Sequence, residues 1–226
     1  MNKDFSEVYF SRSISWFMIQ EFENSMLDIN RAIELEPKNA ELHLHKGTIN
    51  GVLGFYDDAI DNFNTAINID GDKAGYYYNR AMIKTNLNDF DGALDDYEIA
   101  ISIDPTFYDA YHNRAMVYMD HGMYKEATES LSEYIGRTFD SRAIRLQGIC
   151  QYFDKDYQGA LTSLNWSINI DNKNSASYFY KGLSEQALGK EKEGCEDLIR
   201  SSKMGFAPAT DSLNVLCLNR VDGQEP

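Results

Sequence analysis

The sequence predicts an all-α fold in which six similar helix pairs follow one another in a single domain. The first observation is a period, because small residues recur at intervals of 34, 34, 34, 33 and 34 residues, at Ser13, Gly47, Ala81, Ala115, Gly148 and Gly182. The second is that large apolar residues repeat in phase with them, at Ile29, Phe63, Tyr97, Leu131, Leu164 and Leu198. The third is that apolar residues within a unit mostly lie three or four positions apart, which is helical spacing. Self-similarity at a period of this length is typical of stacked repeat proteins.

Six units fit the sequence without a gap, at 6–39, 40–73, 74–107, 108–140, 141–174 and 175–208. In the second unit, "AELHLHKGTINGVL" predicts a first helix and "YDDAIDNFNTAINID" a second helix, with Gly54 in the turn between them. A further series of small residues falls on the second helices, at Ser25, Ala59, Ala93, Ala127, Ala160 and Gly194. Helices approach to about 8–10 Å only where the side chains between them are short. The small residues are therefore expected where the two helices of a unit cross.

The third unit carries a family resemblance in its spacing of aromatic, small and proline residues. The positions concerned are Tyr77, Ala81, Phe90, Ala93, Tyr97, Ala100 and Pro105. This pattern resembles the tetratricopeptide repeat, and the resemblance covers residues 6 to about 208. It implies a right-handed superhelix whose first helices line a concave groove, and a protein that binds peptides or other proteins and catalyses nothing by itself. After the sixth unit, residues 207–220 look like the extra terminal helix of such solenoids, and we assign 209–220 to this C-terminal capping helix.

Two departures from the repeat pattern occur late in the chain. The fourth unit is one residue short near Gly136–Asp140, which predicts that the end of its second helix is shortened or unwound. In the sixth unit, Glu191 stands where the earlier units have an aromatic residue.

Composition excludes several classes of function. The formal net charge of −15 repels phosphate backbones, so we expect no nucleic-acid partner. No run of 18 apolar residues occurs, so we expect no membrane span. Cys150, Cys195 and Cys217 match no metal-binding or redox spacing, and they are interpreted as reduced residues of a cytoplasmic protein. His43 and His45 point to different faces of a helix and share no metal, and nothing predicts a cofactor or a catalytic residue.

A repeated basic–acidic pattern predicts ion pairs inside the units. Places are counted here from the first residue of each unit. Wherever the twenty-third place is Asp, the seventh place is basic, which gives the pairs Arg12–Asp28, Arg80–Asp96 and Lys181–Asp197. We expect each pair to join the two helices of its unit, and the alternative is that the basic side chains only extend along an acidic surface. In either case these residues belong to the scaffold.

The repeated Asn of "YYYNRAMIK" and "AYHNRAMVY" is the first candidate for ligand binding. Asn79 and Asn113 occupy the sixth place, which faces the groove in tetratricopeptide superhelices, where an amide can hold a peptide backbone. The alternative is that each Asn bonds to a neighbouring helix. The basic residue that opens the clamp for acidic chaperone tails is absent, so such a tail is not the expected ligand. The predicted peptide-binding groove comprises Tyr78, Asn79, Met82, His112, Asn113, Met116, Arg142, Arg145 and Ile149.

The predicted function is that of a non-enzymatic scaffold or adaptor that binds a peptide or partner protein in the groove. The groove is aromatic and apolar with two arginines, which favours an amphipathic peptide carrying an acidic group. The alternative is a structural module that associates with a second copy of itself, through an uncapped first unit or the shortened fourth unit. In that case the protein is a homodimer.

Overall fold

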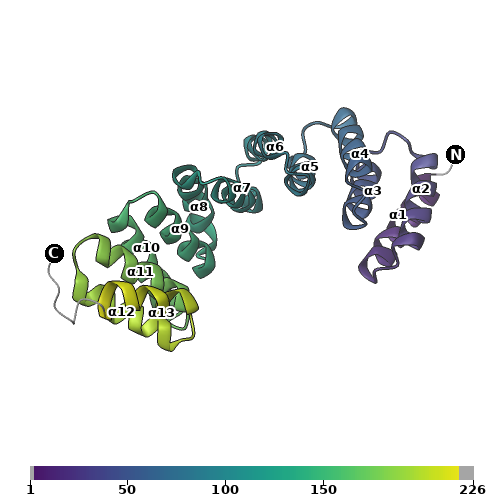
Figure 1. Cartoon of the computed structure of the whole chain (residues 1–226). Coiled ribbons are helices and arrows are strands. Elements are labelled where there is room, and N and C mark those ends of the chain that lie inside the picture. The colour runs from purple at the N-terminus through teal and green to yellow at the C-terminus, as the bar shows by residue number, and fades with distance from the viewer. Residues whose placement is uncertain (1–2, 219–226) are drawn as a thin grey trace. The chain divides into compact units, whose positions relative to one another are not determined.

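The computed structural model describes residues 3–218, and every element of this part of the chain is helical. Helices follow one another in antiparallel pairs (Figure 1). The helices are α1 Lys3–Met18, α2 Phe22–Leu35, α3 Ala40–Val52, α4 Tyr56–Ile69, α5 Ala74–Asn86, α6 Phe90–Ile103, α7 Tyr108–Asp120, α8 Tyr124–Thr138, α9 Ser141–Phe153, α10 Tyr157–Ile170, α11 Ser175–Ala187, α12 Glu191–Lys203 and α13 Ala207–Leu213, and a π-helical turn, η1 Asn214–Leu218, ends the described chain. The all-α prediction is confirmed.

The chain divides into two compact units, Met1–Arg114 and Ala115–Pro226. Their boundary falls inside α7. Each is described by itself below.

The turn inside each helix pair requires a residue with positive φ. Gly54, Gly122 and Gly189 take this place in three of the pairs, with φ values of 81°, 69° and 75°. Gln20, Asn88 and Lys155 take it in the other three pairs, with φ values of 63°, 60° and 65°. Glycine adopts this conformation at no steric cost, whereas the other residues carry a small penalty. The turn therefore has one backbone geometry, which the sequence satisfies in two ways.

Short side chains lie where the helices of a pair cross, as expected. In the first pair, Ser13 and Ser25 face each other, and their hydroxyls donate to each other's backbone carbonyl oxygens, both at 2.8 Å. In the sixth pair the backbones are closer still, because a Cβ atom added to Gly182 would lie 2.8 Å from the carbonyl oxygen of Gly194. The large apolar residues of the in-phase series fill the interior behind these crossings, and all six are at most 2% exposed.

The fourth unit accommodates its missing residue differently from the prediction. The second helix, α8, is not shortened, since it has 15 residues, whereas α4 and α6 have 14. The connection to the next pair is shorter instead, with residues 139–140 where other pairs have 36–39, 70–73, 104–107 and 171–174. Phe139 adopts a left-handed conformation with φ of 52°, which reverses the chain at once. The expected unwinding was wrong because a left-handed C-cap absorbs the deletion.

The C-terminal elements cover the last helix pair. Helix α13 and the π-helical turn contribute Ala209, Leu213 and Leu216 to a cluster with Phe179 and Leu198. The described helical segment reaches residue 218, and the last two residues of the predicted capping helix, 219–220, lie outside the described residues.

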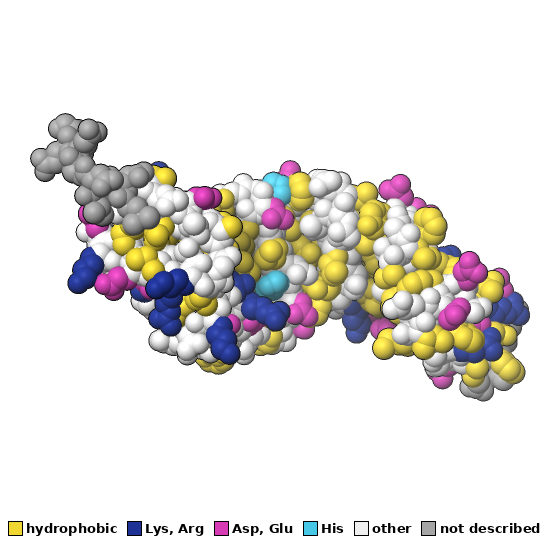
Figure 2. Space-filling model, turned by 60° about the horizontal axis from the view of Figure 1, so that its bottom comes forward, with side chains coloured by type: hydrophobic (Ala, Val, Ile, Leu, Met, Phe, Trp, Pro, Cys, Tyr) yellow, Lys and Arg dark blue, Asp and Glu magenta, His cyan; other side chains and the backbone are white. Residues whose placement is uncertain are grey.

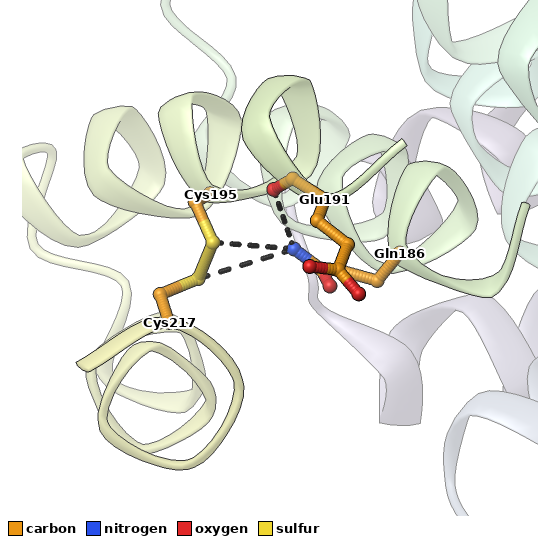
Figure 3. The surroundings of a disulfide bond; sticks show 4 residues. All are labelled: Gln186, Glu191, Cys195 and Cys217. Carbon is orange, nitrogen blue, oxygen red and sulfur yellow. Dashed lines mark hydrogen bonds between the residues drawn. A yellow bond between two sulfur atoms is a disulfide. The ribbon is translucent and has the colours of Figure 1, made fainter. Parts of the chain in front are cut away.

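The expectation that all cysteines are reduced was wrong. Cys195 on α12 and Cys217 on the π-helical turn form a disulfide, with their Cα atoms 5.8 Å apart (Figure 3). Their separation of 22 residues gave no signal in the sequence, but the turn at Gly205, with φ of 85°, brings the last segment back against α12. Gln186 lies beside the bridge and donates its side-chain amide to the carbonyl oxygen of Glu191 at 2.9 Å. Stable disulfides are typical of oxidising compartments, so the cysteines no longer support a cytoplasmic location.

Cys150 is the free thiol of the described chain, and it is buried. Burial raises the pKa of Cys150 to about 12, so the thiol is protonated and unreactive at neutral pH. None of the described helices combines the length and the apolar character needed to cross a membrane. Lys, Arg, Asp and Glu side chains are interspersed with apolar ones on the face that Figure 2 shows.

Candidate functional site

Helices α5 and α7 carry the predicted groove residues of the first compact unit. On α5, buried Ala81 and Ile83 anchor the helix, while Met82 between them is 40% exposed. On α7, Ala110 is fully buried, and His112 and Asn113 are half-buried. The helical period thus divides each first helix into a face that packs and a face that carries the candidate site.

The structure brings Tyr78 and Asn113 together across two consecutive first helices. Nδ2 of Asn113 donates a hydrogen bond to the hydroxyl oxygen of Tyr78 at 2.9 Å. The Tyr78 ring packs edge-on against Phe107 at a centroid distance of 4.8 Å, and it lies 6.0 Å from the Tyr97 ring. Burial raises the pKa of Tyr78, Asp109 adds to this, and the bond from Asn113 opposes it. The phenol is therefore neutral at physiological pH and orients the Asn113 amide.

Asn79 makes a local bond instead. Its Nδ2 donates to the backbone carbonyl oxygen of Gly75, one helical turn earlier, at 2.6 Å. His112 lies next to the Asn113 amide, with Nδ1 3.4 Å from Oδ1 of Asn113. The two Asn side chains thus have different partners, although the sequence repeats them in the same context. Asn113 therefore follows the alternative interpretation, in which the Asn side chain forms a hydrogen bond to a neighbouring helix.

The other predicted site residues belong to the second compact unit. Met116 on α7 is half-buried. On α9, Arg142 is exposed, and Arg145 and Ile149 are half-buried. Asp140 caps α9, accepting a hydrogen bond from the backbone N–H of Arg142 at 2.8 Å. This cap fixes where the helix starts, and with it the positions of both arginines along α9.

All three predicted ion pairs form. Their carboxylate side chains are largely buried, unlike those of ion pairs on an exposed surface. Asp28 and Asp96 each accept two hydrogen bonds from an arginine: Arg12 donates to Asp28 at 2.6 and 2.7 Å, and Arg80 donates to Asp96 at 2.8 and 2.6 Å. Asp96 is only 1% exposed. Lys181 forms the third pair, with Asp197. Each pair joins the first and second helices of its own unit, so these residues are scaffold.

Residues at the eleventh place join two of these pairs, and sequence reasoning missed them. In the third unit Lys84 is a second cation for Asp96, with Nζ 2.8 Å from Oδ2. In the sixth unit Glu185 is a second carboxylate for Lys181, with Oε1 3.0 Å from Nζ. Burial raises the pKa of Glu185, and Oε2 of this side chain makes no hydrogen bond to the described chain. The eleventh place is thus basic in the third unit and acidic in the sixth. A comparison of the seventh, eleventh and twenty-third places of each unit could have revealed this difference.

A metal ion would need a group of side chains that could hold it. In residues 3–218, no three His, Cys, Asp or Glu side chains come together in a way that could hold a metal ion. What the site offers instead is amide, phenol and thioether groups on consecutive first helices. Such groups form hydrogen bonds and apolar contacts with a ligand.

Comparisons with known proteins agree with this architecture. Family models described as tetratricopeptide repeats match residues 74–107 and 97–129. A search of curated proteins found no match.

Solved structures with the same fold span most of the chain. YrrB, described as a TPR protein with an unusual peptide-binding site, has a TM-score of 0.72 and 16% identity, and the match covers 78% of this chain and 91% of YrrB. A tetratricopeptide repeat protein from Parabacteroides merdae has a TM-score of 0.66 and 16% identity, with 94% and 99% covered. The C-terminal part of a TPR repeat-containing protein from Cytophaga hutchinsonii has a TM-score of 0.74 and 17% identity, with 89% and 82% covered. Residues 74–129 thus match tetratricopeptide repeat models, and the chain as a whole has the fold of tetratricopeptide repeat proteins.

Proposed function

We propose that the protein is a non-enzymatic interaction scaffold that holds an extended peptide on the first helices of its third and fourth repeats, around Tyr78 and Asn113. The observation that carries the proposal is the bond between Asn113 and Tyr78, which orients an amide between two consecutive first helices. An amide has two N–H donors and an acceptor oxygen, so this bond leaves further capacity for a peptide backbone. YrrB, which shares the fold, is described as having a peptide-binding site.

The chemistry of the site indicates the kind of peptide. In the first compact unit, Met82 is 40% exposed and Tyr78 is half-buried, so apolar side chains would gain contacts there. In the second compact unit, Arg142 and Arg145 on α9 would pair with an acidic group of a ligand bound to that unit. The proposed ligand is therefore an amphipathic peptide segment with at least one carboxylate.

A paired set of variants tests this proposal against the partner recovered from a native lysate. Asn79→Ala together with Asn113→Ala should weaken binding of that partner by about 1–3 kcal/mol, because the amides would no longer meet its backbone. Replacing Asp57, Asp58 and Asp61 with Asn on α4 is the control, and it should change only a salt-sensitive association rate. If the control abolishes binding while the Asn pair is dispensable, the partner binds outside the groove and the proposal is wrong.

Self-association is a second candidate, favoured by the exposed apolar surface of the first helix pair. The third place of the second to sixth units is buried, with Leu42 at 1% exposure. In the first unit the same place holds Val8, which is 59% exposed. Phe5 on the same helix and Leu27 on α2 are 58% and 69% exposed. A second copy could cover this apolar surface. Light scattering decides: a dimer that Val8→Asp converts into a monomer supports self-association, and a monomer at all concentrations excludes it.

A further inference from the structure

A cavity lies beside the connections that link α2 to α3 and α4 to α5, and none of the predicted groove residues lines it. Its volume is about 630 Å³, within the usual range of ligand pockets. It is lined by residues 36–41 and by Ile69, Asp70 and Tyr76. A second hollow of about 450 Å³ shares Glu41 and Tyr76 with it. All lining residues belong to the first compact unit.

Tyr76 is the unusual residue of this cavity. It is 3% exposed and occupies the third place of its unit. The other buried residues at this place are smaller, namely Leu42, Ala110, Ala143 and Ser177. Its side chain packs with Ala40 and Ala66. Its hydroxyl makes no hydrogen bond to any residue that the structure describes. The hydroxyl oxygen is not among the enclosed polar atoms without a partner, so it is open to a hydrogen bond from a molecule in the cavity.

The charged groups around the cavity are unbalanced. Three carboxylates line it, from Glu36, Glu41 and Asp70, against the single ammonium group of Lys38. None of these four residues takes part in an ion pair of the described chain. Burial raises the pKa of Tyr76, and the charges of Glu41 and Asp70 raise it further, which shows that the cavity presents a negative field to the phenol. A cation in the cavity would relieve this field.

The walls distinguish an organic cation from a metal ion. Pro37, Ala40, Ile69 and the Tyr76 ring provide apolar surface beside the carboxylates. No three acidic, His or Cys side chains of the described chain converge closely enough to hold a metal ion. An arginine or lysine side chain matches both features, because its aliphatic stem covers apolar surface while its charged head remains among polar groups.

We propose that this cavity is a docking site for an arginine or lysine side chain presented by a peptide or protein partner. The ring of Tyr76 forms one wall, and its hydroxyl accepts a hydrogen bond from the cationic head. The carboxylates of Glu41 and Asp70 provide the opposite charge. This site does not depend on the proposed groove, since it shares no residue with it.

The first experiment compares two blocked pentapeptides on the full chain by amide chemical shifts in NMR. One has arginine between two alanines on each side, and the other has citrulline, which is neutral and of the same shape, in place of arginine. The arginine peptide should cause saturable shifts at residues 36–41 and 69–76. The citrulline peptide should bind at least about tenfold more weakly, the loss expected for one charge-assisted hydrogen bond. Equal binding of both peptides would overturn the proposal, and so would displacement of the arginine peptide by stoichiometric magnesium ions.

Variants then place the bound peptide. Tyr76→Phe and the double change Glu41→Gln with Asp70→Asn should each weaken the arginine peptide by about tenfold. The matched control is Asp57→Asn with Asp58→Asn, which removes two charges from the opposite end of α4 and should alter affinity by less than about twofold in physiological salt. An equal loss in the control would show that only net charge attracts the peptide. Loss of binding in the Asn79→Ala, Asn113→Ala variant would place the peptide in the groove, and either result refutes the cavity site.

Discussion

Removing the carboxylate of Asp96 should be among the most destabilising single changes in this chain. The Asp96 side chain is 2% exposed, and its carboxylate accepts hydrogen bonds from Arg80 at 2.8 and 2.6 Å. Lys84 approaches it to 2.8 Å. In Asp96→Ala both cations remain, with their side chains only 17% and 18% exposed, so water restores little of the lost interaction. Removal of one partner from a buried ion pair costs about 3–5 kcal/mol of unfolding free energy.

The assay is urea unfolding followed by circular dichroism, extrapolated linearly to water. Asp95→Ala is the control, since Asp95 is the exposed neighbour on the same helix and its loss should change stability by less than about 0.5 kcal/mol. Asp28→Ala should cost less than Asp96→Ala, because the side chain of Arg12 is 55% exposed and can be rehydrated. If Asp96→Ala and Asp95→Ala unfold within about 1 kcal/mol of each other, the energetic role assigned to the buried pair is wrong.

Three further predictions concern other parts of the fold. Burial raises the pKa of Glu185 above its ordinary value of 4.5. The free energy of unfolding should therefore decrease as pH rises from 4.5 through the raised pKa. Thermal melts across that pH range should show this decrease, and Glu185→Gln should abolish it. Gly182→Ala should destabilise the fold by about 1–3 kcal/mol, because the new Cβ would lie 2.8 Å from a backbone oxygen. The new Cβ of Gly136→Ala would meet nothing within 4 Å, so this change should stabilise its helix by about 0.5–1 kcal/mol. Equal denaturant midpoints for the two variants would contradict this prediction. Reduction of the Cys195–Cys217 bridge, which closes a loop over 22 residues, should cost about 3 kcal/mol, and a melt unchanged by reductant would refute it.

The sequence alone determined the fold class, the repeat and the internal ion pairs. Helical period, small residues at the crossings and basic–acidic spacing are local signals, and each unit repeats them against similar neighbours. The pair Arg80–Asp96 could be predicted because both residues lie inside one unit, on helices whose antiparallel register the repeat fixes. In a repeat of this kind, the place of a residue within its unit therefore predicts where it lies in the structure of that unit.

Tertiary structure decided what depends on single contacts between segments. The Cys195–Cys217 disulfide requires the chain to fold back after α12, and the left-handed Phe139 keeps α8 long despite a deletion. Neither leaves a periodic trace in the sequence. The bond from Asn113 to Tyr78 and the cavity beside Tyr76 are likewise consequences of packing, because identical residue types meet different neighbours in different repeats. Periodicity specifies the scaffold, and the departures from periodicity, which only packing reveals, specify the candidate sites.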